Sequence, residues 1–320
     1  MHTPPEEATP PQYHFTKAVD PAVHRPDFNN HFSSQNRSFS KILKVSIHRP
    51  CLPTPSTSSP EQTEASSPPQ ISPPSANQPQ ESASRFTVIA TVRDSTTDVS
   101  PLNALPKASN SNLIITPLTI STTSTSEVSA AHQALIQSLH SHNISKLDVV
   151  IANAGLGSSF KSTLETPLES IVTDFYANTV GPIALYQNLH PLLKAAPEAK
   201  FVVIGSILGS IGGMLPGAPS LSYGVSKAGV HYAAKKMHDE EEKIVVLPVH
   251  PGYRWRNGGL TVNRWVQTAN GQNFANSIGV PAPPMTAEQS AGAILAQVDR
   301  ATKTTISGTF VGYDGEVVPW

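Results

Sequence analysis

The chain has 320 residues, 38% of them hydrophobic and 14% charged, with a net charge of -1. The length is enough for one large α/β domain or two small ones, and the charge excludes the electrostatic attraction on which nucleic-acid and acidic-membrane binding depend. A lone cysteine, Cys51, excludes a disulfide within the chain, and neither a secretory signal nor a run of about 18 apolar residues occurs, so we expect a cytoplasmic protein.

Residues 1–84 differ in composition from the rest of the chain. From Cys51 to Ser84 about half of the positions are Pro or Ser, and large apolar residues are almost absent. Such a segment cannot bury enough apolar surface to offset its chain entropy, so we expect a disordered extension. Residues 41–47 could form a short strand, but nothing near them supports one. The Pro spacing also allows an interaction tail with stretches similar to Pro-x-x-Pro.

Regular elements are predicted from Phe86 onward, in one domain of residues 85–320. β-branched and apolar runs predict strands at 86–92, 113–118, 147–152, 200–205, 244–249 and 308–311. Helical patterns cover residues 126–142, 168–195, 222–241 and 285–301. Strands that alternate with helices indicate a doubly wound, Rossmann-like parallel sheet with helices on both faces. The ligand crevice of such a sheet lies beyond the carboxyl ends of its strands.

One predicted helix carries a candidate acid. Tyr223 and Lys227 are four residues apart, so their side chains share a helical face. An ammonium group near a phenol lowers the phenol's pKa, which would make Tyr223 a proton donor to a carbonyl undergoing reduction. Taken alone, this spacing is common by chance on helices.

Further residues of interest follow the predicted strands or lie in the predicted helices. They are Thr91-Val92-Arg93-Asp94, Asn153-Ala154-Gly155, Asn178, Ser206 and the pair Tyr223 and Lys227. With these residues the chain, from about Phe86 to its end, resembles the short-chain dehydrogenase/reductases, and among them the fungal ketoreductases. No metal site is expected.

The resemblance implies a role for each catalytic residue. Ser206 would hydrogen-bond the substrate carbonyl, and Tyr223 would protonate its oxygen. Lys227 would hold the hydroxyl groups of the nicotinamide ribose. Asn178 would position a water that connects Lys227 to solvent, the alternative being a residue that bonds the backbone at a helix kink. Ser210 is the rival of Ser206, which directly follows a strand.

The same resemblance implies NADP(H) as cofactor. The Arg93 guanidinium could bind a 2′-phosphate in a bidentate way, although Asp94 is adjacent and a solvated surface arginine is the alternative. Asn153, Ala154 and Gly155 would lie on the adenine side, where Gly155 brings the backbone close. Pro251, Gly252 and Thr268 would lie by the nicotinamide, and Thr119 stands where the family often has an aspartate.

Two features depart from the family pattern. No glycine precedes Gly155, so the glycine-rich turn that binds the pyrophosphate is missing, and the sheet is expected to lack its first strand. Residues 253–264 separate Pro251-Gly252 from Trp265-Val266-Gln267-Thr268, and their removal would restore the family's continuous segment. Both departures could come from an error in the deduced gene structure, or from real divergence.

The sequence therefore predicts an NADPH-dependent ketoreductase that acts on a ketone of a polyketide-like or aromatic secondary metabolite. Its only expected partners are that substrate and further copies of itself, in a homodimer or homotetramer. The alternative is a catalytically impaired dinucleotide-fold protein that serves as a binding module.

Overall fold

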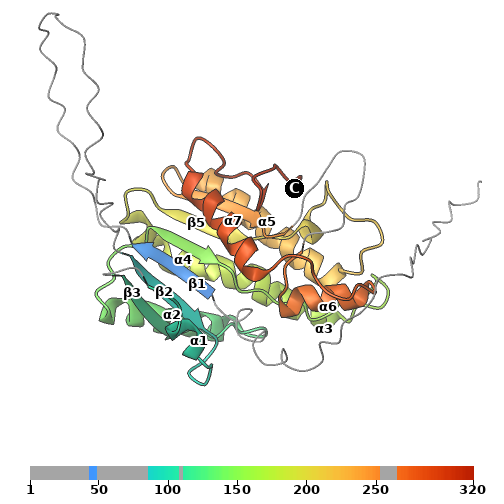
Figure 1. Cartoon of the computed structure of the whole chain (residues 1–320), viewed down its shortest axis with the longest axis horizontal. Helices are drawn as coiled ribbons and strands as arrows, with labels where there is room; N and C mark the ends of the chain where they lie inside the picture. The colour runs from blue at the N-terminus through green and yellow to red at the C-terminus, as the bar shows by residue number, and fades with distance from the viewer. Residues whose placement is uncertain (1–42, 49–85, 108–110, 253–264) are drawn as a thin grey trace, which may run out of the picture. The chain divides into compact units, whose positions relative to one another are not determined.

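The computed structural model describes residues 43–48, 86–107, 111–252 and 265–320, and a seven-stranded sheet runs through them (Figure 1). The strands are β1 (Leu43–His48), β2 (Thr87–Val92), β3 (Asn112–Pro117), β4 (Val149–Ala152), β5 (Lys200–Ile204), β6 (Val245–His250) and β7 (Val311–Gly312). Their order across the sheet is β3-β2-β1-β4-β5-β6-β7. The prediction of a doubly wound, Rossmann-like sheet is confirmed.

One strand runs against the others. β2 with β3, β4 with β5, β5 with β6 and β6 with β7 all pair in parallel, whereas β1 is antiparallel to both of its neighbours. Val45 pairs with Ile89 of β2 and with Val150 of β4. The sheet therefore lacks the parallel first strand of the family, as expected, but the place of that strand is filled.

The residues that fill this place were assigned to the extension by the sequence analysis, which noted them only as an unsupported strand. The structure assigns residues 43–48 to the middle of the sheet. The remainder of the predicted extension and the predicted insertion at 253–264 lie outside the described residues.

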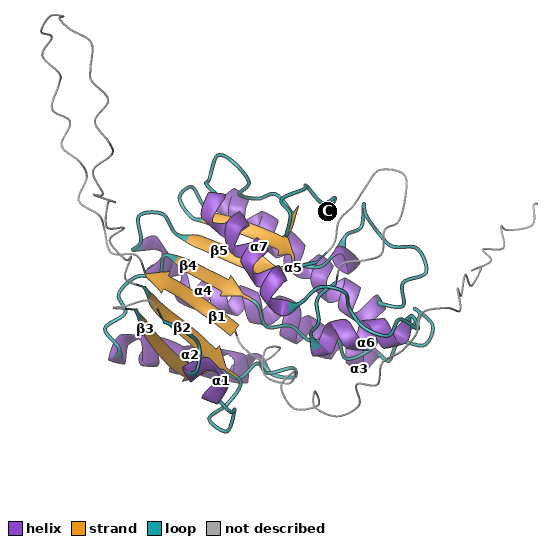
Figure 2. Cartoon of the chain, viewed as in Figure 1, coloured by secondary structure: helices purple, strands orange, loops and turns teal. Residues whose placement is uncertain are grey.

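Helices cover both faces of the sheet (Figure 2). The larger core lies under α2 (Thr125–Ser141), α4 (Gly181–Lys194) and α5 (Leu221–Glu240). A second core lies under α7 (Ala287–Arg300), on the opposite face. β5 shows the alternation that separates them, because Phe201 and Val203 enter the larger core and Val202 enters the second.

The second face is thinly covered at the β2–β3 end. There the buried apolar residues are only Ala90, Val92 and Leu102, the last from the short helix α1 (Ser100–Asn103), and Leu113 and Ile115 beside them are half-buried. No longer helix covers this end among the described residues. The family's first helix would lie on this face, so its absence from the described chain leaves the strands partly open.

The long helical region predicted at 168–195 is one run with a π-helical turn in the middle. α3 (Leu168–Phe175) is followed by Tyr176–Val180 in π conformation and then by α4. Single π turns inside α-helices are rare and frequently occur at functional sites. This turn contains Asn178, which is fully buried.

Most other predicted boundaries agree with the structure to within two residues, apart from the last strand. Residues 303–308 form turns, with Gly308 at φ 69°, so the strand predicted at 308–311 is only Val311–Gly312. The helices α1 and α6 (Ala269–Ser277) were not predicted.

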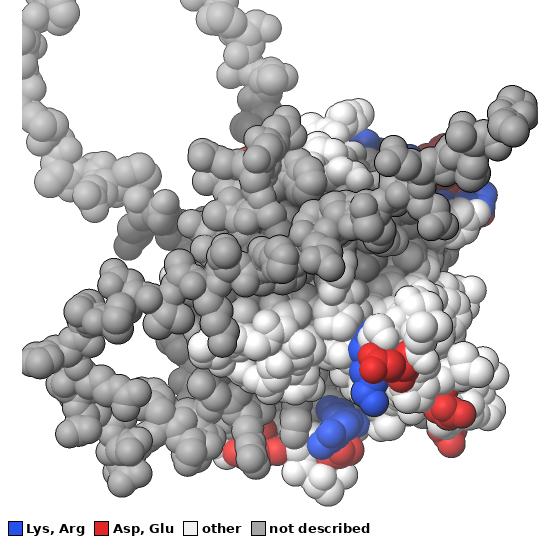
Figure 3. Space-filling model, turned by 90° about the vertical axis from the view of Figure 1, so that its right-hand side faces the viewer, with Lys and Arg blue, Asp and Glu red and all other residues white. Residues whose placement is uncertain are grey.

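The surface carries charges of both signs close together. On the face drawn in Figure 3, basic and acidic side chains neighbour one another, and neither sign forms an extended patch among the residues drawn in colour. No helix of the described chain combines the length and apolar character needed to cross a bilayer.

Candidate active site

The carboxyl edge of the sheet brings Ser206, Tyr223 and Lys227 together. Ser206 follows β5 and caps the 3-10 turn Ile207–Gly209, while the other two residues lie on the first turns of α5. The Ser206 side chain lies close enough to the Tyr223 phenol to lower its pKa, and Lys227 Nζ lies 5.6 Å from the centre of the Tyr223 ring. Ser210 faces away, because its hydroxyl donates to Pro319 O at 2.6 Å.

Two glycines let the Ser206 turn approach α5. A Cβ on Gly209 would lie 2.5 Å from Lys227 Cβ and 2.6 Å from Ala228 N, closer than real Cβ contacts. A Cβ on Gly224 would lie 2.7 Å from Leu208 O. The serine turn and the helix of the phenol and ammonium groups therefore meet backbone to backbone, which fixes the distance between their side chains.

Two buried histidines bind the backbone of the turn that carries Ser206. The Ser206 backbone N–H donates to His231 Nε2 at 3.2 Å, and the Ile207 N–H donates to His250 Nδ1 at 3.3 Å. Burial lowers the pKa of both imidazoles to about 3. Both rings therefore stay neutral and accept hydrogen bonds from the backbone that carries Ser206. The sequence analysis did not identify His231.

Lys227 is buried and holds one backbone oxygen. Its side chain is 3% exposed, and Nζ donates to Ile204 O at 2.7 Å at the end of β5. Burial lowers the pKa of this ammonium group to about 8, against the opposing effect of the Asp174 carboxylate. One hydrogen bond leaves further N–H donors of Nζ for a polyol at this edge.

The prediction that Lys227 lowers the pKa of Tyr223 is wrong for this state of the protein. Burial raises the pKa of the Tyr223 phenol to about 12, and the Asp174 carboxylate adds to the increase. Hydrogen bonds from Ser206 and Asn270 oppose it. The physical reason is the place of the ammonium group, which lies over the ring face and is bonded to Ile204 O. Tyr223 therefore holds its proton at neutral pH.

Asn178 fixes the backbone that follows β4. Its side-chain oxygen accepts from Leu156 N at 2.8 Å, and its Nδ2 donates to Leu156 O at 2.6 Å and to Ser226 Oγ at 2.8 Å. This supports the alternative of a residue that bonds backbone at a helix irregularity. A Cβ on Gly155 would lie 3.4 Å from Asn178 Oδ1 and 3.5 Å from Lys227 Nζ. Gly155 thus lies directly over the ammonium group and leaves the approach to it open.

Asp174 is a buried carboxylate that the sequence analysis missed. It is fully buried on α3, and its Oδ1 accepts from Ser158 N at 2.9 Å. Its charge raises the pKa of both Tyr223 and Lys227. Its position four residues before Asn178 was a usable signal, since the two side chains share a helical face.

Helix α6 forms the other wall of the site and was not predicted. Thr268 caps it by accepting from Gly271 N at 3.0 Å, and Asn270 lies close enough to the Tyr223 phenol to lower its pKa. Phe274 packs against Phe160, with ring centres 5.6 Å apart, and Phe160 lies 5.8 Å from Tyr223. The segment Ala269–Ser277 has few apolar residues, so periodicity gave no signal.

A groove of about 410 Å³ opens between this helix and the loop after β4. It is lined mainly by polar side chains and by one aromatic ring: Gly157, Ser158, Ser159, Phe160, Lys161, Asn273, Asn276 and Ser277. Phe160 connects the groove to Tyr223. The described residues contain no group of three or more His, Cys, Asp or Glu side chains that could hold a metal ion.

The residues predicted to hold the adenosine half lie at the ends of β2 and β4. Arg93 is exposed directly after β2, and its Nε bonds Asp94 Oδ2 at 3.1 Å. Thr119 Oγ1 donates to Arg93 O at 2.9 Å and so ties the ends of β2 and β3 together. Asn153 is exposed after β4. These residues share one edge, but Arg93 is directed to its neighbour rather than to an open site.

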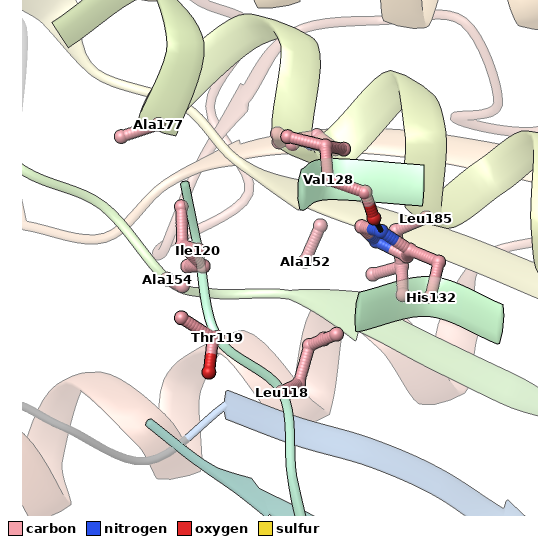
Figure 4. Close-up of a pocket in the computed structure, with 11 residues that line it drawn as sticks. Leu118, Thr119, Ile120, Val128, His132, Ala152, Ala154, Ala177 and Leu185 are labelled. Atoms are coloured by element: carbon pink, nitrogen blue, oxygen red, sulfur yellow. Dashed lines mark hydrogen bonds between the residues drawn. The ribbon is translucent and has the colours of Figure 1, made fainter. Parts of the chain in front are cut away.

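Figure 4 shows an apolar pocket at the same edge, with Thr119, Ala152, Ala154 and Ala177 around it. His132 of α2 forms its far wall, and its Nδ1 is bonded to Val128 O at 2.7 Å. Short side chains from the ends of β3 and β4 and from the π turn leave this space open. Ala154 lines this pocket, and its place on the adenine side of the cofactor stays a prediction.

The residues expected by the nicotinamide are placed by α6 and α7. Ser290 of α7 donates to Pro251 O at 2.6 Å, and Gly252 is buried beside it. The Thr268 hydroxyl caps α6, and Gln267 N donates to Met285 O at 2.8 Å just before it. Pro251 is therefore tied to α7, and Gln267 is tied to Met285, which precedes α7.

Comparisons with known proteins agree with this geometry. The sequence profile of the short chain dehydrogenase family matches residues 83–255. The norsolorinic acid ketoreductase of Aspergillus parasiticus is 35% identical over 241 residues, which cover 74% of this chain and 82% of that protein. The short chain dehydrogenase gsfK of Penicillium aethiopicum is also 35% identical, over 73% of this chain and 89% of that protein.

Solved structures show the same fold. The NADPH-bound carbonyl reductase from chicken fatty liver has a TM-score of 0.52 and 25% identity, covering 65% of this chain and 78% of that one. The carbonyl reductase Sniffer of D. melanogaster has a TM-score of 0.54 and 22% identity, over 72% and 87% of the two chains. The profile match, the similarity to the fungal relatives and the placement of Ser206, Tyr223 and Lys227 together show that this chain belongs to the short chain dehydrogenase family.

Proposed function

We propose that this protein reduces a ketone, with NADPH as the reductant. The observation that carries the proposal is the meeting of a serine hydroxyl, a protonated phenol and a buried ammonium group at the carboxyl edge of the sheet. Relatives named as ketoreductases and a neighbour named as a carbonyl reductase support reduction as the physiological direction.

The residues around Lys227 fit the nicotinamide half of the cofactor. Lys227 retains N–H donors for the ribose hydroxyls, and Gly155 leaves the space above it open. Thr268 and the backbone at Pro251 would border the nicotinamide ring. When bound, NADPH supplies a hydride. Arg93 is the candidate for the 2′-phosphate after it leaves Asp94, which supports NADPH over NADH.

The pyrophosphate half fits poorly. Family members bind it at a glycine-rich turn that leaves the first strand and begins a helix. Here β1 is antiparallel, so its first residue, Leu43, pairs with Thr91 at the carboxyl edge, and the chain leaves β1 at the opposite edge. No described helix begins at that point, and no glycine precedes Gly155. We therefore expect weak NADPH binding compared with ordinary family members.

The chain's own residues account for the proton and the orientation of the ketone. Tyr223, with its raised pKa, carries a proton throughout the neutral range and donates it to the carbonyl oxygen. Ser206 hydrogen-bonds the same oxygen and fixes the angle of the carbonyl. Lys227 Nζ lies 5.6 Å from the centre of the Tyr223 ring and keeps N–H donors for the ribose hydroxyls beside the reacting carbonyl.

The substrate class follows from the walls of the groove. Phe160 offers a flat apolar face beside Tyr223 and packs against Phe274, and the rest of the groove is lined by hydroxyl and amide groups. A planar aromatic or polyketide-like ketone with several hydroxyl groups matches this combination. The names of the fungal relatives agree with such a substrate.

A second candidate function is a dinucleotide-fold binding module without turnover. The antiparallel β1 and the missing glycine turn favour it, because both alter the cofactor site. The two functions differ in one measurement, the consumption of NADPH in the presence of an aromatic ketone.

The test uses the full chain and its Tyr223→Phe variant with NADPH and ortho-hydroxyacetonaphthone. We expect slow but measurable loss of NADPH absorbance with the native chain and a decrease of roughly 10²- to 10⁴-fold with the variant. NADPH binding should be nearly equal in the two proteins, because the phenol oxygen is not needed to hold the cofactor. Unchanged turnover in the variant would refute the role of Tyr223. Absence of turnover in the native chain would favour the binding module.

Apolar residues on two adjacent helices support self-association. Leu168, Val172 and Phe175 are exposed along α3, and Val225 and Tyr232 are exposed on α5, which packs against α3. A second copy that presents the same helices could cover them, as expected for a homodimer. Light scattering of Val172→Lys would then show a monomer, and an unchanged mass would contradict this use of the surface.

A further inference from the structure

Residues 317–320 connect the last strand of the sheet to the loop that follows the catalytic serine. Val318 N donates to Phe310 O, directly before β7, at 2.8 Å. Gly212 N, in the loop after the serine turn, donates to Trp320 O at 2.6 Å. Both hydrogen bonds join backbone atoms of segments that are far apart in the sequence. The reaction described above gives this connection no role.

Ser210 strengthens the connection with its side chain. Its hydroxyl donates to Pro319 O at 2.6 Å and accepts from Gly213 N at 2.8 Å, and the residue is only 2% exposed. A Cβ on Gly212 would lie 3.2 Å from both Pro319 Cβ and Trp320 O, so the loop and the segment are in close contact. A hydroxyl group that donates to one segment and accepts from the other fixes the two in one arrangement.

The same segment also contacts the histidine that binds the Ser206 backbone. The His231 imidazole accepts from Ser206 N–H, and its centre lies 4.2 Å from that of the Phe310 ring and 6.3 Å from that of Trp320. Phe310 and Trp320 also pack together, 5.9 Å apart. A Cβ on Gly205 would lie 2.5 Å from His231 Nε2 and 3.0 Å from the Phe310 ring, which no side chain could occupy. Two aromatic rings therefore hold the imidazole that receives the Ser206 N–H.

We propose that Trp320 and Ser210 are positioning residues for ketone reduction, which hold the turn of Ser206 in place from its two ends. The proposal rests on the ketone reductase function proposed above. Trp320 acts on the start of the turn through the ring of His231, and Ser210 acts on the loop after it through Pro319. The serine hydroxyl thereby keeps its angle to the substrate carbonyl, and a small displacement of such a group is costly in rate.

The test measures reduction of ortho-hydroxyacetonaphthone by the full chain under single-turnover conditions. The enzyme is in excess over the ketone and NADPH is saturating, so slow variants stay measurable. Trp320→Ala should lower the rate about tenfold and leave the NADPH concentration for half-maximal rate unchanged. Trp320→Phe keeps an aromatic ring and should retain most of the rate. Val317→Ala, in the same segment but with a side chain that is 69% exposed, is the control and should match the native chain.

The same substitution in a Ser206→Ala background separates positioning from a general effect on the structure. There the serine hydroxyl is absent, so Trp320→Ala has nothing left to position and should change the remaining rate by less than about twofold. Ser210→Ala supplies a second variant at the other end of the turn. It should lower the rate about threefold in the native background and, again, hardly at all in the Ser206→Ala background.

Circular dichroism confirms that the variants are folded before the rates are compared. Equal losses with and without the Ser206 hydroxyl would show a general structural role and would overturn the proposal. Native rates in both Trp320→Ala and Ser210→Ala would overturn it as well, and both results would leave ketone reduction standing. Absence of reduction by the native chain would remove the proposed function itself and the inference with it.

Discussion

The two ends of the sheet's carboxyl edge differ in how completely they are built. At the β4–β6 end, Asn178, Ser206, Tyr223 and Lys227 are buried or half-buried, and backbone contacts through Gly209 hold them in place. At the β1–β3 end, β1 runs antiparallel, Arg93 is exposed and α1 is the only described helix on one face. Catalytic geometry and cofactor-phosphate binding are thus separable parts of this fold.

The reason lies in the connections. The catalytic half is made by three successive parallel strands and by helices that pack on the larger core, so its residues are fixed by many mutual contacts. Binding of the cofactor phosphates depends on the glycine-rich turn that follows the first strand, and this turn is lost when the strand runs in the opposite direction. A reversed strand satisfies the hydrogen bonds of its neighbours, so the sheet can form although the turn cannot.

The largest expected effect is at the backbone contact of the catalytic half. Gly209→Ala inserts a methyl group 2.6 Å from Ala228 N and must push the Ser206 turn away from α5. We expect a loss of about 10²-fold in ketone reduction and a decrease of about 2 kcal/mol in the free energy of unfolding. Steady-state kinetics and urea unfolding measure these. Gly292→Ala on α7, where a Cβ meets nothing within 4 Å, is the control and should leave ketone reduction unchanged and raise the free energy of unfolding by up to about 1 kcal/mol.

The next largest effect concerns the buried ammonium group of Lys227, at the β4–β6 end of the sheet. The pKa of Lys227 is lowered from 10.5 to about 8, so in this interval the unfolded chain binds a proton that the folded chain does not. The free energy of unfolding should therefore rise by about 2 kcal/mol between about pH 8 and 10, relative to Lys227→Met. Urea unfolding at both pH values measures the difference, and equal slopes in the two proteins would show that the ammonium group is not buried as described.

A smaller effect is expected in acid, from the histidines below Ser206. The pKa of His250 is lowered from 6.5 to about 3, so the unfolded chain binds the extra proton in this interval and stability falls as the pH decreases. His250→Asn keeps an acceptor for Ile207 N–H without titrating. Between about pH 6.5 and 5.5 the free energy of unfolding should fall by about 1 kcal/mol less in the variant than in the native chain. A parallel decrease in both proteins would place the acid sensitivity elsewhere.

The smallest expected effect is the stabilisation of the protein by NADPH, which depends on the β1–β3 end of the sheet. Added NADPH should raise the melting temperature by less than about 1 °C at concentrations that saturate ordinary family members, because a ligand stabilises only to the extent that it binds. Differential scanning fluorimetry measures the shift. A rise of several degrees would mean that the β1–β3 end binds the pyrophosphate in another way, and would end the contrast between the two halves.

The sequence alone predicted the residues at the β4–β6 end of the sheet and some of those at the β1–β3 end. Ser206, Tyr223 and Lys227 could be placed because strand ends and helical spacing are read directly from the residue pattern. The burial that sets the pKa of Tyr223 could not, because it depends on α6 and on the loop that carries Phe160. Asn270 and His231 reach the site across long sequence separations, and α6 has too few apolar residues to show a helical period. The direction of β1 was equally hidden, since an apolar run has the same pattern in either orientation.

The reversal of β1 also changes the topology of the chain. His48 at the end of β1 pairs with Thr87 at the start of β2, so residues 49–86 begin and end at the same edge of the sheet. β1 and β2 are neighbouring antiparallel strands, so the handed crossover of a parallel connection is not required between them.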